Sequence, residues 1–240
     1  MGLNLQKIVV FALHGFWGQG SDFDQFKKML PANFDFRTVD LFLNIEFDLT
    51  SFETVIDQIY KSLVGVTEKK IFIGYSLGGR IGLHLMSKYP DLFHQWIFLS
   101  THPGLQSIKE KNLRIQQDVL WFDKLNCLSW ESFLSEWNAQ PVFQGSMETS
   151  RPRNQFNKDQ LSQAFLNLSL GKQTDMSDVI RINQKKIKWV VGYKDQKFID
   201  LSENLKQKKI LENYSRISSG HRILFDADLK KLMQIILQQQ

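Results

Sequence analysis

A short apolar run leads directly into an amphipathic segment at Lys70-Ile71-Phe72-Ile73-Gly74-Tyr75-Ser76-Leu77-Gly78-Gly79-Arg80. We expect a strand over residues 70–74 and a helix over 78–88, joined by the pattern Gly-X-Ser-X-Gly. Glycine is needed two residues before and after the serine because the turn is too tight for side chains there. The pattern predicts a nucleophile elbow, with Ser76 beside a helix N-terminus that favours negative charge.

The same alternation of short apolar runs and amphipathic segments continues along most of the chain. It predicts an α/β fold, with a mostly parallel sheet of about six strands and helices on both faces. Ser21 is the expected N-cap of one helix. The expected strands are residues 7–13, 34–40, 70–74, 95–100, 187–192 and 214–218, and the expected helices are 21–30, 52–64, 78–88 and 227–237.

The middle of the chain departs from this alternation. From about residue 104 to 176 we find helical periodicity, three tryptophans and no convincing strand. We therefore expect a helical lid at 104–176, inserted between a first core part at 1–103 and a second at 177–240. Cys127, within this lid, is expected to be buried.

Two polar residues that follow later strands complete a constellation with Ser76. Asp195 comes directly after the expected strand 187–192, and His221 follows the expected strand 214–218. The carboxyl ends of parallel strands share one edge of the sheet, so these side chains should meet there. His221 would accept the Ser76 proton, and Asp195 would hold the histidine tautomer. The alternative histidines and acids are His14, His84, His94, His102, Asp200 and Asp226.

An oxyanion hole is predicted next to this constellation. Leu13-His14-Gly15-Phe16-Trp17-Gly18 follows the first expected strand, where a loop can approach the elbow. Such a hole needs two backbone N–H groups aimed at one developing negative oxygen. We expect them to come from Phe16 and Leu77.

Composition limits the classes of protein that remain. A single cysteine among 240 residues excludes a disulfide scaffold and a metal site of several cysteines. The net charge of +5 fits nucleic acid, an anionic membrane surface or a small anionic substrate. No recognition motif accompanies the lysine-rich stretch 181–210, and no apolar run approaches the roughly 18 residues of a membrane span. We expect a cytoplasmic protein, a monomer or small homo-oligomer, with no nucleic-acid partner and no membrane span.

Several motifs together resemble the α/β-hydrolase superfamily over almost the whole chain. Within it, the chain is similar to the 2-succinyl-6-hydroxy-2,4-cyclohexadiene-1-carboxylate synthases of menaquinone biosynthesis. The motifs that carry this resemblance are Leu13-His14-Gly15-Phe16, Gly74-Tyr75-Ser76-Leu77-Gly78-Gly79-Arg80, His102-Pro103-Gly104-Leu105, Arg114 with Asp118, Trp137 with Gln140-Pro141-Val142-Phe143, and Asp195-Gln196-Lys197-Phe198.

The resemblance implies a lyase that uses no metal and no organic cofactor. Its substrate would be 2-succinyl-5-enolpyruvyl-6-hydroxy-3-cyclohexene-1-carboxylate, from which pyruvate leaves after the triad abstracts a proton. Ser76, polarised by His221, would act as the base. The alternative is a carboxylesterase or thioesterase that forms an acyl-enzyme on Ser76. A non-catalytic binding protein of this fold would not need all three triad residues.

A substrate with several carboxylates calls for cationic anchors, and arginine binds carboxylates best. Arg80 follows the elbow, and Arg114 matches a lid arginine of the family by its spacing to Asp118. Arg153 aligns less securely with a third family arginine. Arg151 or Lys158 could take its place, while Tyr75 and Trp137 would shape the pocket.

One loop departs from the superfamily. After strand 34–40 the superfamily usually has Asp-Leu-Pro-Gly-His-Gly, but this chain reads Asp40-Leu41-Phe42-Leu43-Asn44. We expect a rebuilt loop here and a different pocket wall near it.

Overall fold

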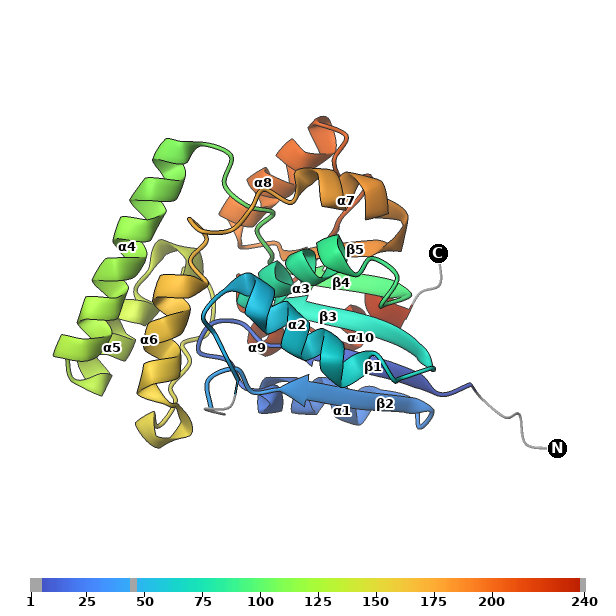
Figure 1. The fold of residues 1–240 in the computed structure, drawn as a ribbon, viewed down its shortest axis with the longest axis horizontal. Helices are drawn as coiled ribbons and strands as arrows, with labels where there is room; N and C mark the ends of the chain where they lie inside the picture. The colour runs from blue at the N-terminus through green and yellow to red at the C-terminus, as the bar shows by residue number, and fades with distance from the viewer. Residues whose placement is uncertain (1–5, 44–46, 238–240) are drawn as a thin grey trace.

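The fold is a parallel sheet between two layers of helices, as seen in a computed structural model that describes residues 6–43 and 47–237 (Figure 1). Its six strands lie in the order β2-β1-β3-β4-β5-β6, and every neighbouring pair is parallel. The strands are β1 (Ile8–Leu13), β2 (Phe34–Val39), β3 (Lys69–Tyr75), β4 (Gln95–Leu99), β5 (Ile187–Gly192) and β6 (Ser215–Ile217). The helices are α1 (Asp24–Met29), α2 (Phe52–Leu63), α3 (Leu77–Lys88), α4 (Ile108–Cys127), α5 (Trp130–Asn138), α6 (Lys158–Asn167), α7 (Ser177–Asn183), α8 (Gln196–Gln207), α9 (Ile223–Asp226) and α10 (Leu229–Leu237).

Each face of the sheet has its own apolar core, because successive side chains of a strand point to opposite faces. In β1, Phe11 and Leu13 join the core covered by α2, α3 and α8. Val10 and Ala12 join the other core, which α1, α9 and α10 cover. Figure 1 shows α2 and α3 in front of the sheet and α1 and α10 behind it. Burial on both faces explains why the strands read as nearly continuous apolar runs.

The α/β fold with six parallel strands is confirmed, and each expected strand lies within two residues of its observed bounds. The N-cap predicted at Ser21 is wrong. A short 3₁₀ helix, Gly20–Phe23, precedes α1, and the Asp22 carboxylate accepts the Gln19 backbone N–H at 3.0 Å. The N-cap of this 3₁₀ helix is Gln19, two residues before Ser21. The Asp22 carboxylate satisfies the Gln19 N–H, which has no partner within the helix. The expected helices also omitted α7, α8 and α9.

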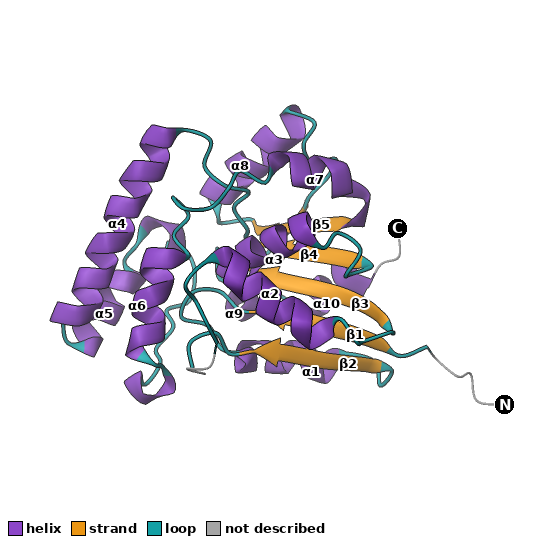
Figure 2. Ribbon diagram, viewed as in Figure 1, coloured by secondary structure: helices purple, strands orange, loops and turns teal. Residues whose placement is uncertain are grey.

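Between β4 and β5, the chain forms helices and loops without a strand from 104 to 176. Figure 2 shows α4, α5 and α6 beyond the carboxyl ends of the strands. An aromatic cluster joins this helical segment to the core, since Trp17 packs edge-on against Trp130 and Phe156, with ring centroids 5.1 and 5.2 Å away. Cys127 is exposed, contrary to expectation, because it ends α4 outside this cluster. No helix in the described residues is long and apolar enough to cross a membrane.

Candidate active site

The elbow at Ser76 joins β3 to α3 through a strained residue. Ser76 has a φ of +50°, a backbone conformation that residues other than glycine rarely adopt. A Cβ atom on Gly78 would lie 2.2 Å from the carbonyl oxygen of Leu13, so only glycine lets α3 approach β1 this closely. The Ser76 backbone N–H donates to the carbonyl of Leu99 at 2.9 Å. Packing and this hydrogen bond together hold the serine at the carboxyl edge of the sheet.

The structure brings Asp195 and His221 to this serine. His221 Nε2 lies 3.3 Å from Ser76 Oγ, and His221 Nδ1 lies 2.7 Å from Asp195 Oδ2. Asp195 and His221 are both 4% exposed. A carboxylate at Nδ1 places the proton on that nitrogen and leaves Nε2 free to accept one from Ser76. Chemically, the arrangement is a serine paired with an oriented base.

The other histidines and acids considered from the sequence have different surroundings. His14 donates from Nδ1 to the Gly15 carbonyl at 2.8 Å and accepts the Leu41 N–H at Nε2, 3.1 Å away. His84 stacks on Phe52, and burial lowers its pKa to about 4. In the described part of the chain, none of the alternatives hydrogen-bonds to Ser76. The other four have hydrogen-bond partners elsewhere. The His94 backbone N–H donates to the Lys70 carbonyl, and His102 accepts the Gly104 N–H. Asp200 accepts from Gln196, and Asp226 accepts the Met147 N–H.

The two backbone groups predicted for an oxyanion hole are available. Phe16 and Leu77 both line the cavity that contains Ser76. Neither backbone N–H has a hydrogen-bond acceptor among residues 6–43 and 47–237. Leu77 is the first residue of α3, where an N–H has no partner within its own helix. Both groups can therefore donate to a ligand.

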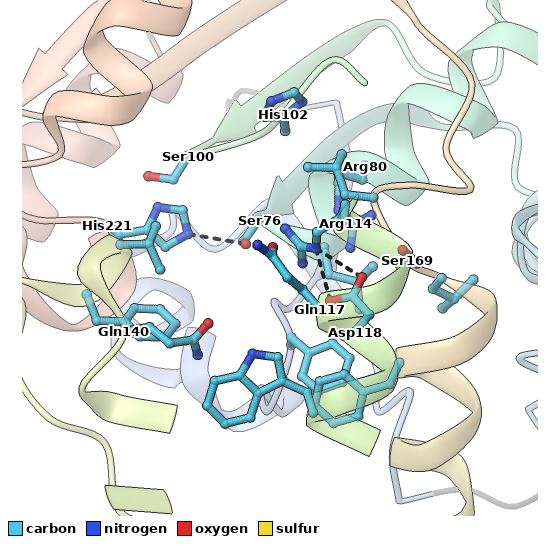
Figure 3. A pocket seen from close by; sticks show the side chains of 18 of the residues that line it. Ser76, Arg80, Ser100, His102, Arg114, Gln117, Asp118, Gln140, Ser169 and His221 are labelled. Carbon is cyan, nitrogen blue, oxygen red and sulfur yellow. Dashed lines mark hydrogen bonds and ion pairs between the residues drawn. The ribbon is translucent and has the colours of Figure 1, made fainter. Parts of the chain in front are cut away.

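Ser76 opens into a cavity of about 340 Å³ between the sheet edge and the helical segment (Figure 3). Tyr75 and Trp137, both predicted for the pocket, line it. Burial raises the pKa of the Tyr75 hydroxyl, so it stays protonated. The Trp137 ring packs 5.4 Å from that of Phe16 and forms part of an apolar wall. Further lining residues are Ser100, His102, Gln117, Phe143, Phe165, Lys197 and Phe198.

Arg80 and Arg114 both reach this cavity, and they differ in their partners. Arg114 Nε lies 3.0 Å from both carboxylate oxygens of Asp118, which is buried. Arg80 is 9% exposed, and the one hydrogen bond of its side chain in the described residues is a 3.5 Å contact to Gln173 Oε1. Burial, and secondly the charge of Arg114, lower the pKa of Arg80 to about 9. A buried cation without a carboxylate is unfavourable until an anion joins it.

Arg153, also predicted as an anchor, does not line this cavity in the structure. It lies in a separate small depression on the helical segment, beside Lys158 and Trp130. Arg151 forms an ion pair with Asp22 instead. Arg153 begins a short 3₁₀ turn, Arg153–Gln155, that follows Pro152.

A cation that the sequence analysis did not assign to the site lines the cavity in place of Arg153. Lys197, in the first turn of α8, lies two residues after Asp195. Burial and then the charge of Arg114 lower its pKa, although part of the side chain is exposed. The available signal was this spacing, because a residue two positions after Asp195 lies in the first turn of the helix that starts at the same sheet edge.

The rebuilt loop after β2 lies behind the cavity wall. The Phe42 ring packs 5.3 Å from both His14 and Phe16. Asp40 accepts the Gly20 N–H at 2.5 Å. Residues 40–43 therefore pack against the Phe16 side chain rather than line the cavity, and Asn44 lies outside the described residues.

Comparisons with known proteins show the fold and some relatives that the chain is similar to. A family model for the alpha/beta hydrolase fold matches residues 44–126. A 2-succinyl-6-hydroxy-2,4-cyclohexadiene-1-carboxylate synthase of Enterobacter sp. (strain 638) is 28% identical over 213 residues, covering 84% of this chain and 81% of the relative. The structure of MenH from S. aureus matches with a TM-score of 0.84 at 20% identity, covering 98% and 94% of the two chains. A carboxylesterase structure from Nitrososphaera gargenis matches with a TM-score of 0.70 at 14% identity, covering 96% and 87%.

The chain is therefore an enzyme of the α/β-hydrolase fold. Within this fold, its sequence is similar to relatives named as 2-succinyl-6-hydroxy-2,4-cyclohexadiene-1-carboxylate synthases, as the resemblance of its motifs predicts.

Proposed function

We propose that this protein is a lyase of menaquinone biosynthesis. It eliminates pyruvate from 2-succinyl-5-enolpyruvyl-6-hydroxy-3-cyclohexene-1-carboxylate. Similarity to the synthases supports this reaction, and one feature of the cavity carries it. Arg80 is buried in the same cavity as Ser76, without a carboxylate partner among the described residues. Together with Arg114 and Lys197, it suits a substrate with several carboxylates.

In the proposed mechanism, Ser76 and His221 act together as the base. Ser76 Oγ takes the proton alpha to the succinyl ketone as its own proton passes to His221 Nε2. Asp195 stabilises the imidazolium that forms. The Phe16 and Leu77 N–H groups stabilise the enolate oxygen. The electron pair then forms the new ring double bond as the bond between the ring carbon and the enolpyruvyl oxygen breaks. The leaving group departs as the enolate of pyruvate and gains a proton to become pyruvate, and His221 returns to its neutral form.

The helical segment serves as a lid in this proposal, and the domain boundaries 1–103, 104–176 and 177–240 follow from it. The segment contributes Arg114 from α4 and Trp137 from α5 to the cavity. Closure over a polyanion would exclude water and strengthen the attraction between the cations and the carboxylates.

A coupled assay for pyruvate release tests the function. We expect turnover by the wild-type protein and none above background for Ser76→Ala. The second candidate is an esterase that forms an acyl-enzyme, because the contact between Ser76 and His221 suits that chemistry equally well. p-Nitrophenyl esters distinguish the two. Fast hydrolysis of these esters without pyruvate release would replace the lyase assignment with the esterase assignment.

A further inference from the structure

His102 is a histidine of the cavity that the proposed mechanism does not use. It follows β4 by three residues and lines the cavity together with Arg80 and Lys197. Figure 3 shows it on the same side of the cavity as Arg80, away from Gln140 and the aromatic wall. The question is which hydrogen-bonding group it presents to a ligand.

A backbone hydrogen bond determines which ring nitrogen of His102 carries the proton. His102 Nδ1 accepts the N–H of Gly104 at 3.0 Å, so Nδ1 carries no proton. A neutral imidazole then carries its proton on Nε2. Nε2 has no partner among residues 6–43 and 47–237. His102 is therefore a hydrogen-bond donor whose acceptor is missing.

The backbone around His102 is held firmly in place. Gln173 Nε2 donates to the His102 carbonyl at 3.1 Å, and the same side chain accepts from Arg80 Nη1. The Met176 N–H donates to the carbonyl of Pro103 at 2.8 Å. Gly104 has a φ of +122°, and a Cβ atom there would lie 2.6 Å from the Thr174 carbonyl oxygen. The turn thus needs glycine, and one glutamine side chain bonds both the His102 backbone and Arg80.

Burial and the charges around His102 keep it neutral. Burial is the largest influence, and the positive charges of Lys197, Arg80 and Arg114 add to it, against the weaker opposing effect of Asp175. Together they lower the pKa of His102 to about 3. A further cation would be repelled here, whereas a neutral donor strengthens an anion site at no such cost.

We propose that His102 is a substrate-positioning residue that donates its Nε2 proton to a carboxylate oxygen of the substrate beside Arg80. The inference rests on the proposed function for the identity of the substrate. The donor and its tautomer follow from the contacts of His102 alone. On the Arg80 side of the cavity, the cation then attracts the carboxylate, and the hydrogen bond from neutral His102 orients it.

His102→Asn tests this role. The side-chain carbonyl oxygen of the introduced asparagine would still accept the Gly104 N–H, as asparagine commonly does two residues ahead, but the distal donor is removed. We expect KM for the synthase substrate to rise about 10-fold or more, since a hydrogen bond to a charged group is lost, with kcat nearly unchanged. Thermal unfolding should be unaffected. His94→Asn, at an exposed histidine outside the cavity, is the matched control and should change neither parameter.

Histidine NMR separates this proposal from the proposed function. In ¹⁵N-histidine-labelled protein, the His102 signals are those absent from His102→Asn. We expect the neutral Nε2–H form from pH 5 to 8, and a shift of that signal when succinate is added. A charged or Nδ1-protonated His102, or no response to succinate, would overturn the role of His102 whether or not pyruvate is released. Wild-type protein that shows the expected NMR behaviour but releases no pyruvate would overturn the lyase assignment only.

Discussion

The two sides of the cavity differ in whether their polar groups have partners within the protein. On the Ser76 side, Asp195, His221 and Ser76 form a continuous chain of hydrogen bonds and are complete without a ligand. On the other side, Arg80 has no carboxylate and the Nε2 proton of His102 has no acceptor among the described residues. The reactive groups are preorganised, whereas the anchoring groups require an anion. We therefore propose that substrate selection resides on the second side.

The largest expected effect comes from a substitution on the Ser76 side of the cavity. Asp195→Asn should lower kcat about 10³- to 10⁴-fold, because the amide no longer holds the His221 tautomer that leaves Nε2 free. Steady-state pyruvate release measures this, and KM should change little. A loss of less than 10-fold would show that Asp195 does not orient the base. Asp200→Asn, at an exposed acid on α8, is the control.

Arg80→Met should weaken substrate binding on the Arg80 side of the cavity without destabilising the fold. We expect kcat/KM to fall about 10²- to 10³-fold, because a hydrogen-bonded charge partner of the substrate is lost. The melting temperature should hold or rise, since methionine removes a buried cation that has no carboxylate in the described structure. An unchanged kcat/KM would place the substrate elsewhere. A sharp fall in melting temperature would instead make Arg80 a structural residue.

Arg151→Met tests how the helical segment keeps the two sides together. Arg151 pairs with Asp22, whose side chain is 4% exposed, and so joins this segment to the loop after β1. Leaving Asp22 buried and unpaired should cost about 3 kcal/mol of unfolding free energy. Urea unfolding measures it. At temperatures where the variant is folded, KM should rise more than kcat falls, because the segment carries Arg114 and Trp137.

Arg153→Ala should have the smallest effect and sets the baseline for the others. Arg153 is exposed and lies in a depression separate from the Ser76 cavity. We expect less than a 2-fold change in kcat/KM, as for most surface substitutions. A 10-fold loss would mean that this stretch moves into the cavity when substrate binds.

The sequence was most informative where the chemistry depends on neighbours in the chain. The Gly-X-Ser-X-Gly spacing located Ser76, because the need for glycine is confined to one turn. Asp195 and His221 could be placed with Ser76 because each directly follows a strand. The position of Arg153 outside the cavity could not be read from the sequence, because it depends on how a long loop between α5 and α6 packs and no residue pattern encodes that path.

The sequence by itself therefore determined the parallel sheet, the elbow and the two residues that meet Ser76. All of these follow from local periodicity and from the geometry of strand ends. Only the tertiary structure decided that Lys197, and not Arg153, joins Arg80 and Arg114 at the cavity, and which proton His102 offers. The glutamine that joins Arg80 to His102 is 93 residues from Arg80 in the chain. Such contacts are set by the packing of distant elements, so burial and charge at the site emerge only when the chain has folded.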